Sequence, residues 1–175
     1  GGSAIEEMDY FVDNGIPFSL LVKLGKDMQG ETHLDYITSE YGIEEDDVLY
    51  SSAPSSISME GTLLVKNTAP SFIKKEEVMD FIEKNHIDKI IISSLLLSFD
   101  PVKKEITEAL EKEKDRIKVV VVDAEDITHT MMIEDLYESI KRISKAIPDT
   151  YISGDILTEV GVKRVSSEMI KDLFI

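Results

Sequence analysis

The stretch KIIISSLLL at residues 89–97 decides the fold, together with IKVVVV at residues 117–122. Both runs are apolar throughout apart from the two serines and the lysines, which is typical of strands buried on both faces of a parallel sheet. Helical spacing of apolar residues precedes and follows them, at residues 75–84, 102–110 and 133–143. Strands that alternate with helices predict an α/β fold, with a doubly wound, mostly parallel (Rossmann-like) sheet between two layers of helices.

The same alternation extends toward both ends of the chain. Residues 4–14 predict an amphipathic helix that stops at Asn14-Gly15, and residues 16–24 predict a strand. A second helix is expected over 31–41, with Gly42 at its end. A short strand at 150–153 and a helix at 165–174 complete the pattern, and Asp100-Pro101 is expected to start the helix that follows. At 175 residues, we expect one α/β domain spanning 1–175.

One segment interrupts the alternation. Residues 48–65 read VLYSSAPSSISMEGTLLV, rich in serine and β-branched residues, with Glu60-Gly61 between two short strand-like runs. This pattern predicts a β-hairpin, inserted as a small β-lid at about 48–66. Insertions on such scaffolds often carry function.

The composition excludes several classes of function. The net charge is −16, from 19 Lys+Arg against 35 Asp+Glu, so the surface repels nucleic acid and anionic membranes. The absence of cysteine excludes disulfides, thiolate nucleophiles and Cys-ligated metals, and fits a cytoplasmic protein. No apolar run reaches the roughly 20 residues of a membrane-spanning helix.

Candidate functional residues lie where strands end, since ligands of such folds gather beyond the carboxyl ends of the strands. Three segments meet this condition: Gly25-Lys26-Asp27, Ser98-Phe99-Asp100 and Asp123-Ala124-Glu125. Asp123 suits contacts with sugar hydroxyls, bases or metals, but could equally cap the segment that follows. The three histidines have no partner at metal-ligand spacing, so no metal site is expected.

The glycines form a larger pattern. Gly1-Gly2 stand before small residues and a helix that ends at Gly15, and a strand then leads into the turn Gly25-x-Asp27-x-x-Gly30. This order resembles the first signature of the PfkB family of ribokinase-like carbohydrate kinases. Residues 56–62 are similar to the two lid strands of that family, residues 91–97 to a later strand, and residues 120–125 to the strand that ends in Asp-Pro-Asn.

The resemblance implies a small-molecule kinase, which transfers the γ-phosphoryl group of ATP to a hydroxyl of a sugar or nucleoside with Mg²⁺. It assigns substrate binding to Gly1, Gly2, Glu6, Asp27 and Ser58. It places Asp123 and Glu125 on the nucleotide or metal side. Lid strands in the family close over the substrate and often pair with a second subunit, so a homodimer through the lid is also implied.

The chain departs from the family at several positions. Glu6 stands where the family has Asn, and Asp123-Ala124-Glu125 replaces Asp-Pro-Asn. The second signature, D-T-x-G-A-G-D, which supplies the catalytic base and an anion hole, does not occur in residues 1–175. We therefore expect the chain as given to be incomplete and inactive, and not to bind ATP and Mg²⁺ itself, either as a fragment of a kinase or as a degenerate relative.

Two alternatives stay open. The chain could be a non-catalytic relative of the fold that binds a ligand or dimerises through the lid, with Glu6 and Glu125 favouring a cationic or polyhydroxyl ligand. It could instead be an unrelated flavodoxin-like or receiver-like domain, with Asp123 as phosphoacceptor or metal ligand. The hairpin has no natural place in that last fold, so a structure without it would favour this alternative.

Overall fold

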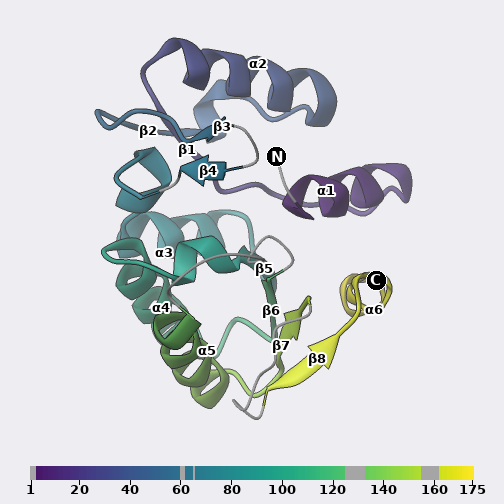
Figure 1. Ribbon diagram of the computed structural model, residues 1–175. Helices are drawn as coiled ribbons and strands as arrows, with labels where there is room; N and C mark the ends of the chain where they lie inside the picture. Colours follow the sequence, from purple (N-terminus) through teal and green to yellow (C-terminus); the bar gives the residue numbers. More distant parts are fainter. Residues whose placement is uncertain (1–2, 60–61, 65, 125–132, 155–161) are drawn as a thin grey trace.

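The principal sheet has four parallel strands. The computed structural model describes residues 3–59, 62–64, 66–124, 133–154 and 162–175. Strands β5 (Lys89–Ser93), β6 (Val119–Asp123), β7 (Thr150–Ser153) and β8 (Lys163–Val165) lie side by side in that order (Figure 1). The register aligns their carboxyl ends, with Ser93 opposite Asp123 and Asp123 opposite Ser153.

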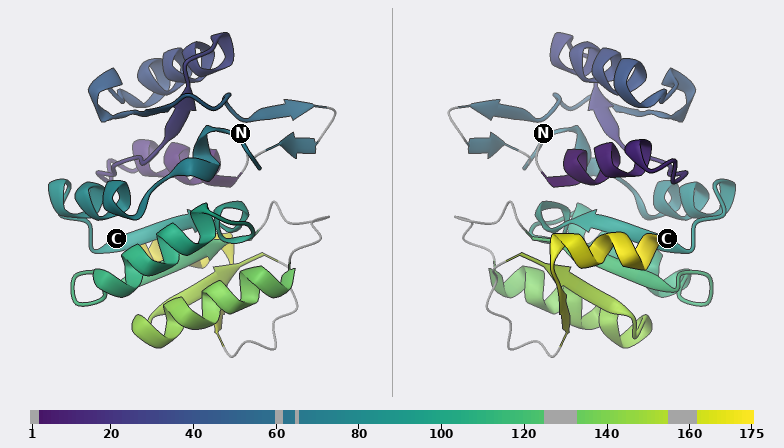
Figure 2. Two further views of the ribbon diagram at one scale, coloured as in Figure 1. Left: turned by 90° about the vertical axis from the view of Figure 1, so that its left-hand side faces the viewer. Right: turned by 90° about the vertical axis from the view of Figure 1, so that its right-hand side faces the viewer.

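Helices cover both faces of this sheet, which confirms the predicted three-layer α/β architecture. Alternate residues of β6 face opposite ways, because side chains alternate along a strand. Val120 and Val122 pack in the main core with α3 (Lys75–Lys84), α4 (Val102–Lys112) and α5 (Ile133–Ala146). Val121 packs instead with Ile170 of α6 (Ser167–Phe174) on the other face (Figure 2).

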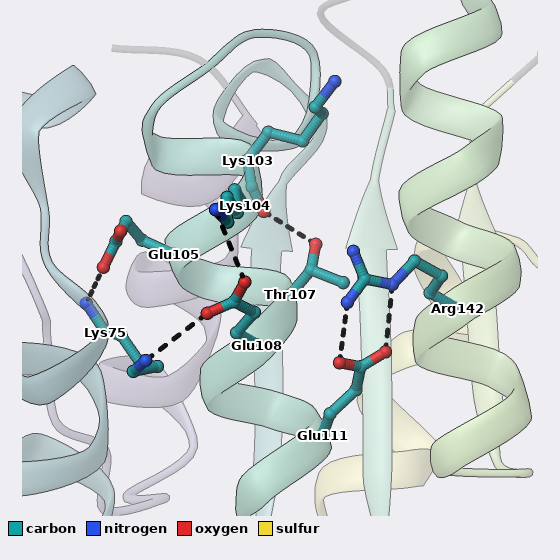
Figure 3. A network of polar contacts seen from close by, with 8 residues as sticks. All are labelled: Lys75, Lys103, Lys104, Glu105, Thr107, Glu108, Glu111 and Arg142. Carbon is teal, nitrogen blue, oxygen red and sulfur yellow. Dashed lines mark hydrogen bonds and ion pairs between the residues drawn. The ribbon is translucent and has the colours of Figure 1, made fainter.

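Ion pairs tie the helices of the first layer together along their outer surface (Figure 3). The Lys75 backbone N–H donates to Glu105 Oε2 at 2.6 Å, which joins the start of α3 to α4. Arg142 of α5 donates from Nε and Nη2 to the two oxygens of Glu111 of α4, at 3.0 and 2.8 Å. This bidentate pair raises the pKa of Arg142. These contacts join α3 to α4 and α4 to α5.

A second parallel pair carries the amino-terminal part of the chain. Strands β1 (Lys23–Gly25) and β2 (Leu49–Ser51) pair in parallel, and α2 (Met28–Tyr41) packs on them through Leu24, Ile37 and Val48. Gly42 ends α2 with a left-handed backbone, φ 67°, as predicted.

A buried ion pair connects β1 to the main helical layer. Lys23 is 5% exposed, and its Nζ donates to Glu77 Oε1 and Oε2 of α3 at 2.7 and 2.8 Å. The same ammonium donates to the carbonyl of Phe72 at 3.0 Å. The parallel pair is therefore fixed to the helices that cover the four-stranded sheet.

Helix α1 (Ser3–Asp13) packs against α6, at the other end of the sequence. The rings of Phe11 and Phe174 have centroids 5.7 Å apart, and Lys171 Nζ lies 4.3 Å from the centre of the Tyr10 ring. The two ends of the described chain thus lie side by side.

The predicted hairpin is present. Strands β3 (Ile57–Met59) and β4 (Thr62–Leu64) are antiparallel, with Ile57 opposite Leu64. Residues 49–51, included in the predicted insertion at about 48–66, belong to β2 and pair with β1. A structure without this hairpin would have favoured a flavodoxin-like or receiver-like domain. Because the hairpin is present, the structure does not favour that alternative. Short 3₁₀ turns lie at Glu45–Asp47, Ala69–Phe72 and Ser94–Leu97.

Two predicted strands were too long. The strand expected over 89–97 ends at Ser93, because Ser94–Leu97 folds into a 3₁₀ turn in which Ser98 Oγ donates to the Ser94 carbonyl at 2.7 Å. The strand expected over 16–24 is confined to Lys23–Gly25, since β2 offers only three partner residues.

Two further details of the predicted pattern were wrong. Asp100 does not cap the following helix: the Asp100-Pro101 peptide bond is cis, α4 begins at Val102, and the Asp100 carboxylate lies 3.7 Å from Lys103 Nζ. Strand β8 was not predicted, because its Lys163-Arg164 pair is exposed and lacks the apolar signature of a buried strand.

In the described part of the chain, no helix is both long and apolar enough to cross a bilayer.

Candidate functional site

Two polar clusters lie at carboxyl ends of parallel strands, and the first is the turn after β1. Asp27 is the N-cap of α2: its Oδ1 accepts a hydrogen bond from the Gly30 N–H at 2.7 Å. Its Oδ2 accepts a second from the Ser55 N–H at 2.8 Å, across the turn. The Gly25 N–H donates to Ser55 Oγ at 2.9 Å. Four residues from two segments far apart in sequence are thereby joined by hydrogen bonds.

The two glycines of this turn are required for close packing. A Cβ on Gly25 would lie 2.5 Å from the Ser55 nitrogen and 2.7 Å from the Ala53 carbonyl oxygen. A Cβ on Gly30 would overlap the Gly25 carbonyl oxygen and lie 2.9 Å from Ser55 Oγ. Backbone atoms of the two segments fill this space, so any side chain there would push them apart.

The Asp27 carboxylate is held in its charged form. The backbone N–H of Ser55, the N–H of Gly30 and the Ser55 hydroxyl lower the pKa of Asp27, since each bond favours the ionised oxygen. A carboxylate thus occupies the N-terminus of α2, which is where such folds otherwise bind phosphate. Asp27, predicted to bind substrate, has both oxygens committed to backbone donors.

The second cluster lies at the carboxyl ends of β6 and β7. Asp123 and Ser153 are 3% and 0% exposed, and Ser153 Oγ donates to Asp123 Oδ1 at 3.1 Å. Ser93 ends β5 beside Asp123 in the register. Ser94 follows, is fully buried, and its hydroxyl has no hydrogen-bond partner among the described residues. Hydroxyls and one carboxylate are the groups that recognise polyhydroxyl ligands.

Both clusters face the same side of the molecule. In the left view of Figure 2, the hairpin that follows Ser55 extends on the side where β6 ends and α5 begins. The base of the hairpin and the Asp123 cluster therefore belong to different sheets but lie toward the same side of the molecule.

The other predicted site residues are less fully described. Glu6 lies in α1 and Ser58 in β3, but the description of both covers only the backbone. Gly1, Gly2 and Glu125 lie outside the described residues. Sequence reasoning missed Ser55 and Ser153. The serine-rich segment around Ser55 is a sequence feature that could have indicated a polar site. Ser153 is a lone serine at the end of a short strand, and no sequence feature indicates its role.

A metal site built from protein side chains alone is not found among the described residues. Among them, no group of three histidine, aspartate or glutamate side chains could hold a metal ion. Asp123 offers one carboxylate, and Mg²⁺ in kinases is held by one or two carboxylates together with the phosphates and water. At the α2 N-terminus, the Asp27 carboxylate already accepts the Gly30 N–H.

Comparison with known proteins gives similarity at the level of structure. No family model and no curated protein matches the sequence. An uncharacterised sugar kinase from Pyrococcus horikoshii, solved with ATP, superposes with a TM-score of 0.66 at 14% identity, covering 87% of this chain and 52% of that one. A fructokinase from Xylella fastidiosa gives a TM-score of 0.64 at 14% identity, with 87% and 51% covered.

An aminoimidazole riboside kinase from Salmonella enterica, solved with aminoimidazole riboside and an ATP analogue, gives a TM-score of 0.53 at 15% identity, with 76% and 44% covered. The chain spans about half the length of the first two structures. At this identity the likeness defines the fold. The parallel sheet, its two helical layers and the hairpin together give this chain the ribokinase-like fold of PfkB-type sugar kinases.

Proposed function

We propose that this chain forms the substrate-binding side of a ribokinase-like kinase that phosphorylates a hydroxyl of a sugar or nucleoside. The observation that carries the proposal is the pairing of a lid-like hairpin with a polar strand-end cluster, Asp123 and Ser153, on the fold of sugar kinases. In this proposal the whole chain is a cytoplasmic protein.

The chemistry of the edge supports a neutral polyhydroxyl substrate. The Asp123 carboxylate accepts hydrogen bonds and the Ser94 hydroxyl donates and accepts them, and a sugar offers both kinds of partner. A net charge of −16 disfavours a substrate that arrives heavily phosphorylated. Glu6, Ser58, Gly1 and Gly2 complete the proposed substrate side, and Glu125 stays on the proposed nucleotide side.

Catalysis needs groups that residues 1–175 do not contain. The D-T-x-G-A-G-D signature is absent from them. The proposed contribution of this chain is therefore to bind and orient the acceptor alcohol and to keep water from it, both of which phosphoryl transfer requires.

The test is a panel of sugars and nucleosides incubated with Mg-ATP and the full protein that contains this chain. ADP release that depends on one class of alcohol supports the proposal. The variant that tests the site is Asp123→Asn, which keeps the shape of the side chain and its contact with Ser153 but removes the charge. An active panel member whose KM is insensitive to this change would refute the assigned site.

A non-catalytic role is the second candidate, favoured by the absence of the second signature from these residues. Such a protein would bind a polyhydroxyl ligand without turnover, or would dimerise through the hairpin, whose two strands pair only with each other among the described strands. Ligand binding without ADP release would identify this role, whereas a dimer detected by analytical ultracentrifugation would not distinguish it from the kinase. Dimerisation through the lid is also expected of the kinase.

A further inference from the structure

The two ends of the hairpin segment meet at a single point, which we call the neck and which consists of Pro54, Ser55 and Ala69. The Ala69 N–H, beyond the second strand, donates to the carbonyl of Pro54, ahead of the first strand, at 2.7 Å. The 14 intervening residues, 55–68, therefore leave and re-enter the molecule at one point. Ser55 and Ala69 are 1% and 0% exposed, so this point lies inside the protein.

The neck is fixed to the rest of the fold through the turn after β1. Asp27 Oδ2 accepts the Ser55 N–H at 2.8 Å, and Ser55 Oγ accepts the Gly25 N–H at 2.9 Å. These two bonds run in opposite senses between the same two segments, which fixes their relative position in two directions. The absence of a Cβ on Gly25 and Gly30 allows the contact.

We propose that Asp27 is a positioning residue which anchors the hairpin over the substrate edge through Ser55, rather than a group that binds the substrate. This role rests on the proposed function, because the hairpin can cover a substrate only if one binds at the carboxyl ends of the strands. One oxygen of Asp27 caps α2 and the other holds the neck, so a single side chain sets the hairpin relative to β1 and α2. Its depressed pKa agrees with this double use.

Substitution can separate the two uses of Asp27. Asp27→Ser keeps one oxygen at a position where serine is a preferred N-cap, so the Gly30 N–H stays satisfied, but the shorter side chain does not reach Ser55. Asp27→Ala removes both bonds. Ser55→Ala keeps the bond from the residue 55 backbone N–H to Asp27, but it removes the hydroxyl that also lowers the pKa of Asp27 and deprives the buried Gly25 N–H of its acceptor. Ser166→Ala, which removes the N-cap of α6 from Met169, is the matched control for losing a cap elsewhere.

The measurement is amide hydrogen exchange of the 175-residue chain. In Asp27→Ser, amides of Ile57–Met59, Thr62–Leu64 and Ala69 should exchange about tenfold to a hundredfold faster, the range for a lost bond to a charged group, while α2 stays protected. Asp27→Ala should accelerate both regions. Ser55→Ala should accelerate the neck, and Ser166→Ala should leave hairpin and neck unchanged.

Unchanged hairpin exchange in Asp27→Ser would overturn the proposal, as would equal acceleration over the whole chain. If Asp27→Ser folds poorly, Asp27→Asn, which keeps one acceptor oxygen, serves in its place with the same expected pattern. In an active full-length kinase, Asp27→Ser should raise the KM for the alcohol more than it lowers kcat, whereas a fold defect would lower kcat alone.

Failure of the anchor and failure of the proposed function give different results. If the panel shows no kinase activity but hairpin exchange responds as expected, the anchor stands and the function falls. If the panel shows activity and hairpin exchange does not respond, the anchor falls and the function stands.

Discussion

The Lys23–Glu77 ion pair makes an asymmetric prediction about stability. Lys23 is 5% exposed while the Glu77 side chain is 25% exposed, so removing either charge leaves the other in a different environment. Glu77→Gln keeps the size of the side chain but leaves a buried ammonium without a counter-charge. Lys23→Met leaves a carboxylate that solvent reaches and that still accepts the Lys74 N–H at 2.8 Å.

The expected magnitudes follow from burial. Leaving a buried charge unpaired costs about 3–5 kcal/mol, and the partial exposure of this pair favours the lower end, about 3 kcal/mol for Glu77→Gln. Losing the partner of an accessible charge costs about 1 kcal/mol, which we expect for Lys23→Met. For a chain of this size these values correspond to drops in Tm of about 6–12 °C and 2–4 °C.

Urea unfolding followed by circular dichroism measures both variants, with the midpoint and the slope m fitted separately. Lys84→Met is the matched control, because Lys84 pairs with Asp47 at 3.0 Å where both side chains are more than half exposed. That change should cost less than about 1 kcal/mol. If Lys23→Met destabilises as much as Glu77→Gln, the inference that the ammonium is the buried member of the pair is wrong.

Three further comparisons test the packing and the turn: two pairs of substitutions and one pH titration. Gly30→Ala should cost at least about 2 kcal/mol in urea unfolding because its Cβ would overlap backbone, whereas Gly42→Ala, with open space but φ +67°, should cost only about 1 kcal/mol of backbone strain; equal costs would contradict this. Leu136→Ala, at 0% exposure, should lower the free energy of unfolding by about 2–5 kcal/mol, and Met169→Ala, at 56%, by less than about 0.5 kcal/mol. The stabilisation from Asp27 should be complete above its ordinary pKa of 3.8 and be lost as pH falls through the lower folded value, so the stability gap to Asp27→Ser, followed by urea titration at each pH, should shrink below about pH 4 and not above it.

The sequence predicted the architecture because the strands that form it are unambiguous. IKVVVV is apolar at every position but one, and in the structure alternate valines of β6 face opposite helical layers. The helix ends at Asn14-Gly15 and Gly42 were predictable for a different local reason. Glycine adopts the left-handed backbone conformation at the lowest energetic cost, and both glycines have positive φ. Local chemistry alone determined these features.

Features that depend on distant partners were not predictable. KIIISSLLL is apolar to its end, yet the strand stops at Ser93 because the next four residues fold against α4 and α5. The role of Asp27 depends on its contact with Ser55. The serine-rich segment is visible in the sequence, but nothing in either segment indicates that these two residues meet. Ser153 pairs with Asp123 only because β7 lies beside β6 in a register that the sequence does not specify.

A single titration tests the central claim most directly. The ¹⁵N amide spectrum of the chain would be recorded while neutral sugars and nucleosides are added, one class at a time. Shifts that saturate and map to Ser55, Ser94, Asp123 and Ser153 would support a polyhydroxyl site at the carboxyl edge of the sheet. Saturating shifts confined to the outer surface of α3, α4 and α5 would contradict it, and so would the absence of shifts with a sugar or nucleoside that the full-length protein phosphorylates.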